Sequence, residues 1–401
     1  MNPLKIAYAA LISRPFHSFL NASAVAAGVA LLVTIFLLSD AIQQSISRNS
    51  QGVDIVVGAK GSPVQLVLST IYHSDIPGGN IEMKDFQRLQ KNPQIKEAIP
   101  VAIGDNYKGW RIVGTTPAYL DNFGAKFSQG RSFAKPFEAV AGAATDLKIG
   151  DEFAAMHGFT ADGDDKHDFH LYRIVGVLQP TGMVLDRLIT TSFESVQELH
   201  SHHHHDDHDA AEEAALGHEI TAVLLKVKNP VAVLNLPREI NQSTNMMAVS
   251  PRFQMVKLSQ SLGVGKNALI GIGYGVMGLS FLMLLSTLMA SLSARKYDLA
   301  ILRVMGASRF ILSSIIIAES LMLTIAGSAI GILAGHLISA VIGFSVSGFE
   351  NITMPLHLLF PSIIDIKIIM LAVAAGLIAS VAPAILARRT DIASILSTGK
   401  Y

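Results

Sequence analysis

The sequence predicts an α-helical membrane protein, in which four transmembrane helices carry one large α+β domain between the first helix and the second. Half of the residues are hydrophobic and only 15% are charged, and the mean hydropathy is +0.42. This is too apolar for a soluble globular protein. A spanning helix needs about 20 apolar residues. Four stretches reach this length, at residues 19–38, 269–290, 311–344 and 366–386.

Composition and motifs exclude several functions. Acidic and basic residues balance, which gives no indication of nucleic-acid binding. The absence of cysteine excludes disulfides, thiolate catalysis and cysteine-based zinc sites. GVGKN (263–267) resembles part of a phosphate-binding loop, but it lacks the upstream glycine and has Asn267 where serine or threonine is needed. With no catalytic triad or carboxylate pair evident either, we predict no catalytic residue, no enzyme and no cofactor bound by motif.

Lysine and arginine near the helix ends predict the orientation, because cytoplasmic loops are enriched in them. These basic residues precede the first stretch, lie between the second and third, and follow the fourth: Lys5, Arg14, Arg295, Lys296, Arg303, Arg309, Arg388 and Arg389. The connection between the third and fourth stretches has only acidic charge, at Glu350 and Asp365. Both termini are therefore predicted in the cytoplasm. The chain divides into an N-terminal amphipathic segment with the first helix (1–44), an outer domain (45–262) and a C-terminal helical region (263–401).

The first apolar stretch could instead be a cleaved signal peptide. LLSDAIQQ (37–44) offers no good small-x-small cleavage site, and cleavage would remove a helix that keeps the basic loops inside. A retained anchor is the favoured interpretation.

The outer domain has the pattern of a mixed fold. Runs rich in β-branched residues at 53–58, 109–114, 172–178 and 220–227 predict strands, and the spacing at 82–92 predicts a helix. Strands mixed with a few helices indicate an α+β fold. The loop at 59–81 contains His73 and Asp75, whose spacing suits a metal or a hydrogen bond. Because its glycines and prolines already explain the loop, a purely structural role is favoured.

The third apolar stretch has two special features. Gly327, Gly331 and Gly335 recur every four residues and form one smooth stripe on a helix, which allows another helix to approach closely. The partner helix could belong to this chain or to a second subunit. Glu319 is a carboxylate within the span, which is costly and faces protein or water. It is either part of a transport path or, as we favour, a structural group near the interface that is paired with Arg303 or Arg309 or is protonated.

The segment at 292–310 is a cytoplasmic connection with helical periodicity. Tyr297, Ile301 and Val304 or Met305 share one face, and Gly306 ends the pattern. Such a helix between two spans could dock into a groove on a cytosolic partner or lie on the membrane surface.

Several motifs together resemble one family. RKYDLAILRVMGASRFIL (295–312) is similar to the cytoplasmic coupling segment of the FtsX-like, MacB-type ABC transporter permeases, AESLMLTIAGSAIGILAGH (318–336) to their third helix and PAILARRTDIASIL (383–396) to their C-terminal tail. In the outer domain, the segments 111–133, 143–153 and 172–189 resemble successive pieces of that family's periplasmic core domain. The resemblance covers nearly the whole chain, in the right order.

The resemblance implies a subunit of the bacterial inner membrane, with its large domain in the periplasm. Members work as dimers on two cytosolic ATPase subunits, so it implies a separate ATPase, a second permease copy or a paralogue, and contact with membrane lipids. The expected ATPase-coupling residues are Arg295, Lys296, Asp298, Leu302, Arg303, Gly306 and Ala307. Some members export from the periplasm or release lipoproteins, whereas others transport nothing and activate a periplasmic protein. Both kinds of function stay open, because fold does not give a substrate.

A histidine and aspartate tract, HSHHHHDDHD (200–209), lies within a histidine-rich loop predicted at 200–218. Imidazole and carboxylate suit Zn²⁺, and also Ni²⁺ or Cu²⁺. The candidate ligands are His200, His202, His203, His204, His205, Asp206, Asp207, His208, Asp209 and His218. A pH sensor and an inert soluble spacer remain open. A metal carrier without an ATPase is disfavoured, because the intramembrane ionisable residues are few, chiefly Glu319 and His336.

Overall fold

The computed structural model describes residues 2–157, 166–201, 219–345 and 362–388. The chain forms two compact units. One, the membrane unit, contains the residues up to Ala41 and most of those from Gly263 onward; the other, the outer unit, contains Ile42–Leu262. Each unit is described separately below.

The membrane unit is helical. Its helices are α1 (Pro3–Ile12), α2 (Pro15–Asn49), α9 (Pro251–Ala294), α10 (Lys296–Val304), α11 (Arg309–Ser345) and α12 (Ile363–Arg388). Within the described residues, four helices are long and apolar enough to cross a membrane, namely α2, the 265–294 part of α9, α11 and α12. The predicted set of four spans is therefore confirmed.

Proline marks the first residue of many of these helices. Proline is suited to this position because its fixed φ matches the helix and its missing N–H would have no partner there. Asn2 completes the start of α1 by accepting a hydrogen bond from the backbone N–H of Leu4 at 3.0 Å. In the membrane unit, the helices that begin at a proline are α1, α2 and α9.

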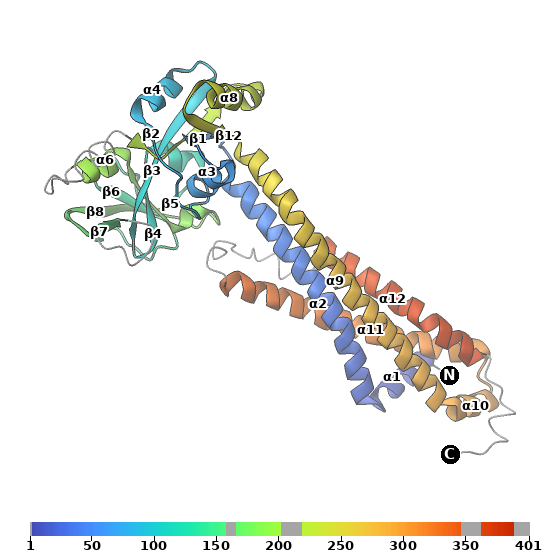
Figure 1. Cartoon of the computed structure of the whole chain (residues 1–401). Coiled ribbons are helices and arrows are strands. Elements are labelled where there is room, and N and C mark those ends of the chain that lie inside the picture. The colour runs from blue at the N-terminus through green and yellow to red at the C-terminus, as the bar shows by residue number, and fades with distance from the viewer. Residues whose placement is uncertain (1, 158–165, 202–218, 346–361, 389–401) are drawn as a thin grey trace. The chain divides into compact units, whose positions relative to one another are not determined.

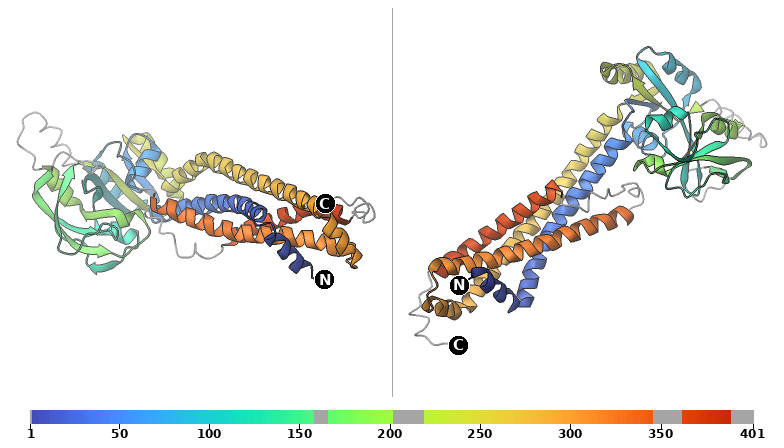
Figure 2. Two further views of the ribbon diagram at one scale, coloured as in Figure 1. Left: turned by 90° about the horizontal axis from the view of Figure 1, so that it is seen from below. Right: turned by 180° about the vertical axis from the view of Figure 1, so that it is seen from behind.

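Helix contacts in the membrane unit centre on α11. This helix packs along α12, and α1 lies against its first half, where Ala7 contacts Ile315 and Ala318. Figure 2 shows α2 and α9 side by side. A Cβ added at Gly28 of α2 would lie only 3.2 Å from the backbone Cα of Met277 in α9. Outward-facing residues on α9 and α11, such as Leu279 and Leu333, are exposed, as expected of a surface that lipid covers.

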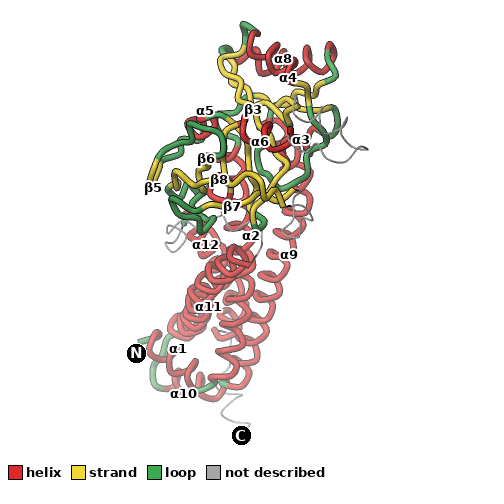
Figure 3. The backbone as a smooth tube through the Cα atoms, turned by 90° about the vertical axis from the view of Figure 1, so that its left-hand side faces the viewer, coloured by secondary structure: helices red, strands yellow, loops and turns green. Residues whose placement is uncertain are grey.

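The outer unit is built on one mixed sheet with short helices around it (Figure 3). Its helical elements are α3 (Pro63–Thr70), α4 (Met83–Lys91), α5 (Pro117–Asn122), η1 (Val184–Arg187), α6 (Phe193–Ser201) and α8 (Pro230–Ser243). Its strands are β1 (Ile55–Ala59), β2 (Ile81–Glu82), β3 (Ile95–Tyr107), β4 (Trp110–Thr115), β5 (Phe127–Gly130), β6 (Glu138–Ala141), β7 (Glu152–His157), β8 (Lys166–Leu178), β9 (Leu188–Ser192), β10 (Glu219–Ile220), β11 (Ala222–Val227) and β12 (Met246–Val249).

Among the described residues, the main sheet has the strand order β12-β1-β11-β3-β4-β9-β6-β8-β5, with β7 beside β3 and β8. The pairs β4–β9 and β6–β8 are parallel, and the other pairs in the sheet are antiparallel. Alternate residues of a strand face opposite sides. In β1, Val56 therefore joins one core cluster while Ile55 and Val57 join another. Both faces of the sheet are thus covered.

Candidate functional site: the junction around the coupling helix

The predicted cytoplasmic connection folds as the short helix α10. It is separated from α9 at Arg295, whose ψ of 13° departs from helical geometry, and it ends before Gly306. Gly306 has a φ of +94°, which glycine adopts without the strain that a side chain would bring. The break therefore lies at the residue that the sequence pattern predicted. The positive φ explains why this residue is glycine.

One side of α10 is apolar and exposed. Tyr297 is 51% exposed, Ile301 40% and Val304 67%, and Met305 just beyond the helix is 72% exposed. Leu299 and Ala300 on the other side are buried against the bundle. An exposed apolar stripe on a helix that also has a buried face is the arrangement of a docking surface.

The predicted coupling residues divide between these two sides. Lys296, Asp298 and Gly306 are exposed. Arg303 is half-buried, Leu302 packs partly into the bundle, and Ala307 is buried. Whether this set contacts an ATPase stays a prediction.

Arg295 connects three helices at the start of α10. Its Nη2 donates to the backbone oxygen of Ala10 in α1 at 2.9 Å and to Oγ of Ser13 at 3.3 Å. Its Nη1 lies 3.7 Å from Oε2 of Glu319 in α11. The Arg295 side chain is only 16% exposed. At the start of α10, one guanidinium thus contacts both α1 and α11.

The partner of Glu319 differs from the one expected. The sequence analysis favoured Arg303 or Arg309, but the ion pair that the structure contains is with Arg295. Arg303 lies in the last turn of α10 and Arg309 begins α11, whereas Glu319 lies about 15 Å along the axis of α11 from its first residue. The end of α9 reaches this depth beside α11, so that Arg295 arrives from a neighbouring helix.

The glycine stripe of α11 packs against α2 of the same chain. A Cβ at Gly327 would lie 2.7 Å from the backbone oxygen of Ala22. A Cβ at Gly331 would lie 2.7 Å from that of Ala26, and one at Gly335 3.0 Å from that of Ala30. Backbone can approach this closely only where no side chain intervenes. The open choice between the same chain and a second subunit is thus decided for this stripe.

Asp365 lies in a helix and not, as expected, in the connection before it. It occupies the first turn of α12, is fully buried, and has Oδ2 3.3 Å from Nε2 of His336 in α11. Its Oδ2 also accepts from the backbone N–H of Ser362 at 2.6 Å. A carboxylate that accepts this bond stabilises a helix start, which explains why an acidic residue begins this span. Glu350 lies outside the described residues.

His73 in the 59–81 loop makes a hydrogen bond in the outer unit. Its Nε2 lies 3.2 Å from the hydroxyl of Tyr119, and both side chains are buried. Within the described residues, no group of three histidine, aspartate or glutamate side chains is placed to hold a metal. The hydrogen bond to Tyr119 therefore gives His73 a structural role, which agrees with the structural role that the sequence favours for this loop.

Burial of His73 predicts an acid-sensitive outer unit. Burial, together with the charge of Arg111, lowers the pKa of His73 from 6.5 to about 3. Below pH 6.5, the imidazole of His73 therefore binds a proton in the unfolded chain but not in the folded chain. Above pH 6.5, this difference does not change the free energy of unfolding. Between pH 6.5 and pH 3, it lowers the free energy of unfolding by up to about 1.4 kcal/mol for each pH unit of acidification.

Replacing His73 with asparagine is expected to reduce the pH dependence of the free energy of unfolding, by an amount that corresponds to the uptake of up to one proton. Asparagine tolerates the φ of +48° at this position. Trp110, the only tryptophan of the chain, reports unfolding of the outer unit by fluorescence in urea at pH 7.5 and pH 5. An identical slope for the variant and the natural chain would contradict the prediction.

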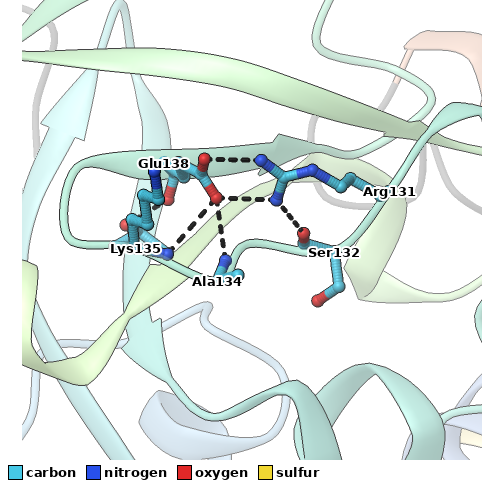
Figure 4. A network of polar contacts seen from close by, with 6 residues as sticks. Arg131, Ser132, Ala134, Lys135 and Glu138 are labelled. Atoms are coloured by element: carbon cyan, nitrogen blue, oxygen red, sulfur yellow. Dashed lines mark hydrogen bonds and ion pairs between the residues drawn. The ribbon is translucent and has the colours of Figure 1, made fainter.

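Two polar networks brace the outer unit, and the sequence analysis missed both. Arg131 and Glu138 form two hydrogen bonds of 2.6 and 2.7 Å, and Glu138 also accepts from the backbone N–H of Ala134 (Figure 4). Hydrogen bonds from Arg131 lower the pKa of Glu138 to about 2. Arg131 and Glu138 are seven residues apart, and a loop joins them. Neither a helical nor a strand period therefore predicts that they pair.

The second network lies at the turn before η1. The buried carboxylate of Asp186 accepts from the backbone N–H of Thr181 at 2.8 Å and from that of Gly182 at 2.8 Å. The backbone N–H of Val184 in η1 donates to Oδ1 of Asn49 at 2.8 Å. The Pro-Thr-Gly sequence before an aspartate was a turn signal that could have indicated this loop.

The histidine tract falls almost entirely outside the described residues. His200 lies near the end of α6, a helix that the sequence analysis did not expect between the strands now identified as β9 and β11. His202, His203, His204, His205, Asp206, Asp207, His208, Asp209 and His218 lie outside the described residues. Metal binding by the tract therefore stays a prediction.

Comparison with known proteins assigns both parts of the chain. Residues 18–243 match the MacB-like periplasmic core domain, and residues 270–392 match the FtsX-like permease C-terminal domain. Comparison with curated proteins found no match.

Two solved structures are similar to the chain. The periplasmic region of MacB from Actinobacillus actinomycetemcomitans is 13% identical, with a TM-score of 0.34, and the match covers 53% of this chain and 97% of that one. The extracellular domain of the noncanonic ABC-type transporter YknZ from Gram-positive bacteria is 12% identical, with a TM-score of 0.30, and the match covers 49% of this chain and 98% of that one. With the core-domain match spanning more than half of the sequence, the chain belongs to the MacB and FtsX-like family of ABC transporter permeases, multi-pass proteins of the inner membrane.

Proposed function

We propose that this chain is the membrane subunit that couples ATP hydrolysis on a separate cytosolic ATPase to movement of its own periplasmic domain. The observation that carries the proposal is α10, a short helix between two spans with an exposed apolar stripe and a buried opposite face. An ATPase groove would receive Tyr297, Ile301 and Val304. The chain itself has no catalytic role in this proposal, because the hydrolytic site lies on the partner.

The proposed orientation follows from the basic residues around α10 and at the ends of α2 and α12. Both termini and α10 lie in the cytoplasm, and the outer unit lies in the periplasm. Two such permease subunits, identical or paralogous, would sit on two ATPase subunits. This arrangement places α10 where an ATPase can reach it.

Two long helices supply the route for movement. Residues 42–49 at the end of α2 and residues 251–262 at the start of α9 belong to the outer unit. Inside the outer unit, the end of α2 is held by two hydrogen bonds: Tyr72 donates its hydroxyl to the backbone oxygen of Ile46 at 2.9 Å, and Asn49 accepts from Val184 at 2.8 Å. Force on α2 would therefore pass to the loops around α3 and η1.

Affinity purification of the tagged chain from native membranes tests the class of the protein. We expect an ABC ATPase to co-purify, and we expect a double substitution of Ile301 and Val304 by glutamate to remove it. Lys367→Gln, an exposed lysine near the start of α12, serves as the control that keeps the ATPase bound. Recovery of the chain without any ATPase would contradict the proposal.

A second candidate function is mechanical signalling without transport, in which the outer unit activates a periplasmic protein. The braced end of α2 supports this candidate as well, because such a role also requires force to reach the outer unit. Reconstitution with the co-purified ATPase separates the two. ATP-dependent flux of a substrate would favour transport, whereas ATP-dependent binding or activation of a periplasmic protein without flux would favour signalling.

We also propose a link to zinc or another divalent metal through the histidine tract. Clustered imidazoles and carboxylates in a loop form overlapping weak sites, which suit a sensor or collector better than a structural zinc. Deletion of residues 200–209 is expected to lower the bound zinc and to alter the zinc sensitivity of the complex, measured by metal analysis and ATPase assays. Unchanged metal content and unchanged zinc sensitivity would sink this proposal.

A further inference from the structure

A small cavity, whose wall is mostly apolar but carries a few polar side chains, lies in the membrane unit beside the Arg295 junction. Its volume is about 220 Å³, equal to about seven water molecules at roughly 30 Å³ each. Helices α1, α2, α9 and α11 all contribute to its wall, which carries Arg14, His17, Asn21 and Glu319 among apolar residues. This space fits a small polar group and is too small for a lipid tail.

The charges of the cavity are separated and not balanced. Glu319 is 8% exposed and lies 3.7 Å from Arg295, and Arg14 lines the same cavity. The 3.7 Å ion pair with Arg295 is too long for a hydrogen bond. Two guanidinium groups and one carboxyl group thus lie at or beside this cavity, which gives one guanidinium more than carboxyl groups and leaves the Glu319 oxygens able to accept further hydrogen bonds.

Two more polar side chains lie in the wall. Asn21, which is 2% exposed, uses its Oδ1 to accept from the hydroxyl of Thr287 at 3.1 Å. That bond leaves the amide N–H groups of Asn21 to donate to another acceptor. His17 adds a second group beside Arg14 that can donate to an anion. The cavity therefore offers donors for an anion at one part of its wall and an acceptor for a cation at another.

The depth of the cavity matches the level of lipid headgroups. Helix α11 has 37 residues and is about 55 Å long, whereas the hydrocarbon core is about 30 Å thick. Glu319, about 15 Å from the start of α11, therefore lies near the edge of the hydrocarbon. Phe16 and Phe19, which are each 70% exposed, precede and follow the cavity residues His17 and Ser18 on α2.

We propose that the cavity binds the headgroup of a phospholipid that carries both a phosphate and a primary ammonium. Arg14 and His17 bind the phosphate, and Glu319 accepts hydrogen bonds from the ammonium. Arginine and phosphate form strong charge-assisted hydrogen bonds, as do ammonium and carboxylate. A choline headgroup has no N–H to donate, and a glycerol headgroup places no positive charge near Glu319. Ethanolamine phospholipid is thus the preferred ligand.

Native mass spectrometry of the purified full chain, titrated with ethanolamine, choline and glycerol phospholipids, tests the inference. We expect roughly five- to tenfold tighter retention of the ethanolamine lipid. Glu319→Gln is expected to lose the preference for ethanolamine over choline, and Arg14→Gln is expected to weaken all three. Arg309→Gln, an exposed arginine at the same end of α11 that does not line the cavity, is the matched control.

Free phosphate and phosphoethanolamine, added as competitors, distinguish a lipid headgroup from a soluble ligand. Displacement by either competitor at low concentration would assign the site to a soluble phosphate compound and overturn the lipid assignment. Equal retention of the three lipids by the natural chain would overturn the inference without any variant. The measurement needs no ATPase, so its failure would leave the proposed coupling function untouched.

Discussion

Replacing Gly331 with leucine is expected to prevent the membrane unit from folding stably. The first carbon of the new side chain would lie 2.7 Å from the backbone oxygen of Ala26 and 2.7 Å from Cβ of Val29. Neither contact can be relieved by rotating a flexible side chain, because one is with backbone and the other with a branched carbon. Overpacking of this kind costs about 3 kcal/mol or more. The measurement is the fraction of detergent-solubilised protein that elutes as a single species, with its unfolding temperature.

Gly278→Leu in α9 supplies the matched control. It makes the same chemical change within a span, but among the described residues no atom beyond its own turns of helix lies within 4 Å of the added Cβ. We expect this variant to keep the unfolding temperature of the natural chain in detergent. If both variants unfold alike, the damage comes from leucine at any glycine of a span and not from the contact between α2 and α11.

Replacing Arg295 with methionine is expected to uncouple the complex. Methionine keeps much of the side-chain volume but removes the hydrogen bonds to Ala10 and Ser13 and leaves Glu319 without its ion pair. Breaking a largely buried pair on one side costs about 3–5 kcal/mol. We expect the ATPase to remain bound through α10 while ATP-driven work per ATP hydrolysed falls by about tenfold or more.

Two companion variants interpret this result. Arg309→Met changes an exposed positive charge at the start of α11, outside the expected coupling residues, and is expected to leave coupling intact. The Arg295→Met, Glu319→Gln double variant removes both charges and is expected to recover part of the stability that Arg295→Met loses, because no unpaired carboxylate remains. The same coupling ratio in Arg295→Met and the natural chain would contradict a role for Arg295 in transmission.

Helices and strands of this protein could be predicted where a single hydrophobic period, helical or strand-like, dominates the sequence. The four spans, the helix at α4, the strands at β1, β4, β8 and β11, and the break at Gly306 all follow from hydrophobic spacing and punctuation by glycine. Helix α6 was missed because its nine residues, which begin at Phe193, mix polar and apolar side chains over little more than two turns. A segment that short carries too few periods to separate a helix from a loop.

Polar partners were predicted less well. The sequence analysis placed Glu319 within a span but predicted an ion pair with Arg303 or Arg309, which are close in sequence. It placed Asp365 in the connection before the fourth span. Both carboxylates are instead matched by residues of another helix, Arg295 and His336, which lie 24 and 29 positions away in the chain. No periodicity relates residues on separate helices, so the pairing depends on how those helices pack.

By itself, the sequence determined that this is a membrane protein with four apolar helices, an inserted mixed domain and an amphipathic helical segment between two of those helices, because apolar length, basic loops and short-range periods act within one element. Only the tertiary structure decided that the stripe of Gly331 packs against α2, that Arg295 joins α1, α10 and α11, and that Arg14, His17 and Glu319 surround one cavity. These facts depend on the close approach of helices far apart in sequence, and backbone contact of that kind is set by the packing of whole helices rather than by any local pattern.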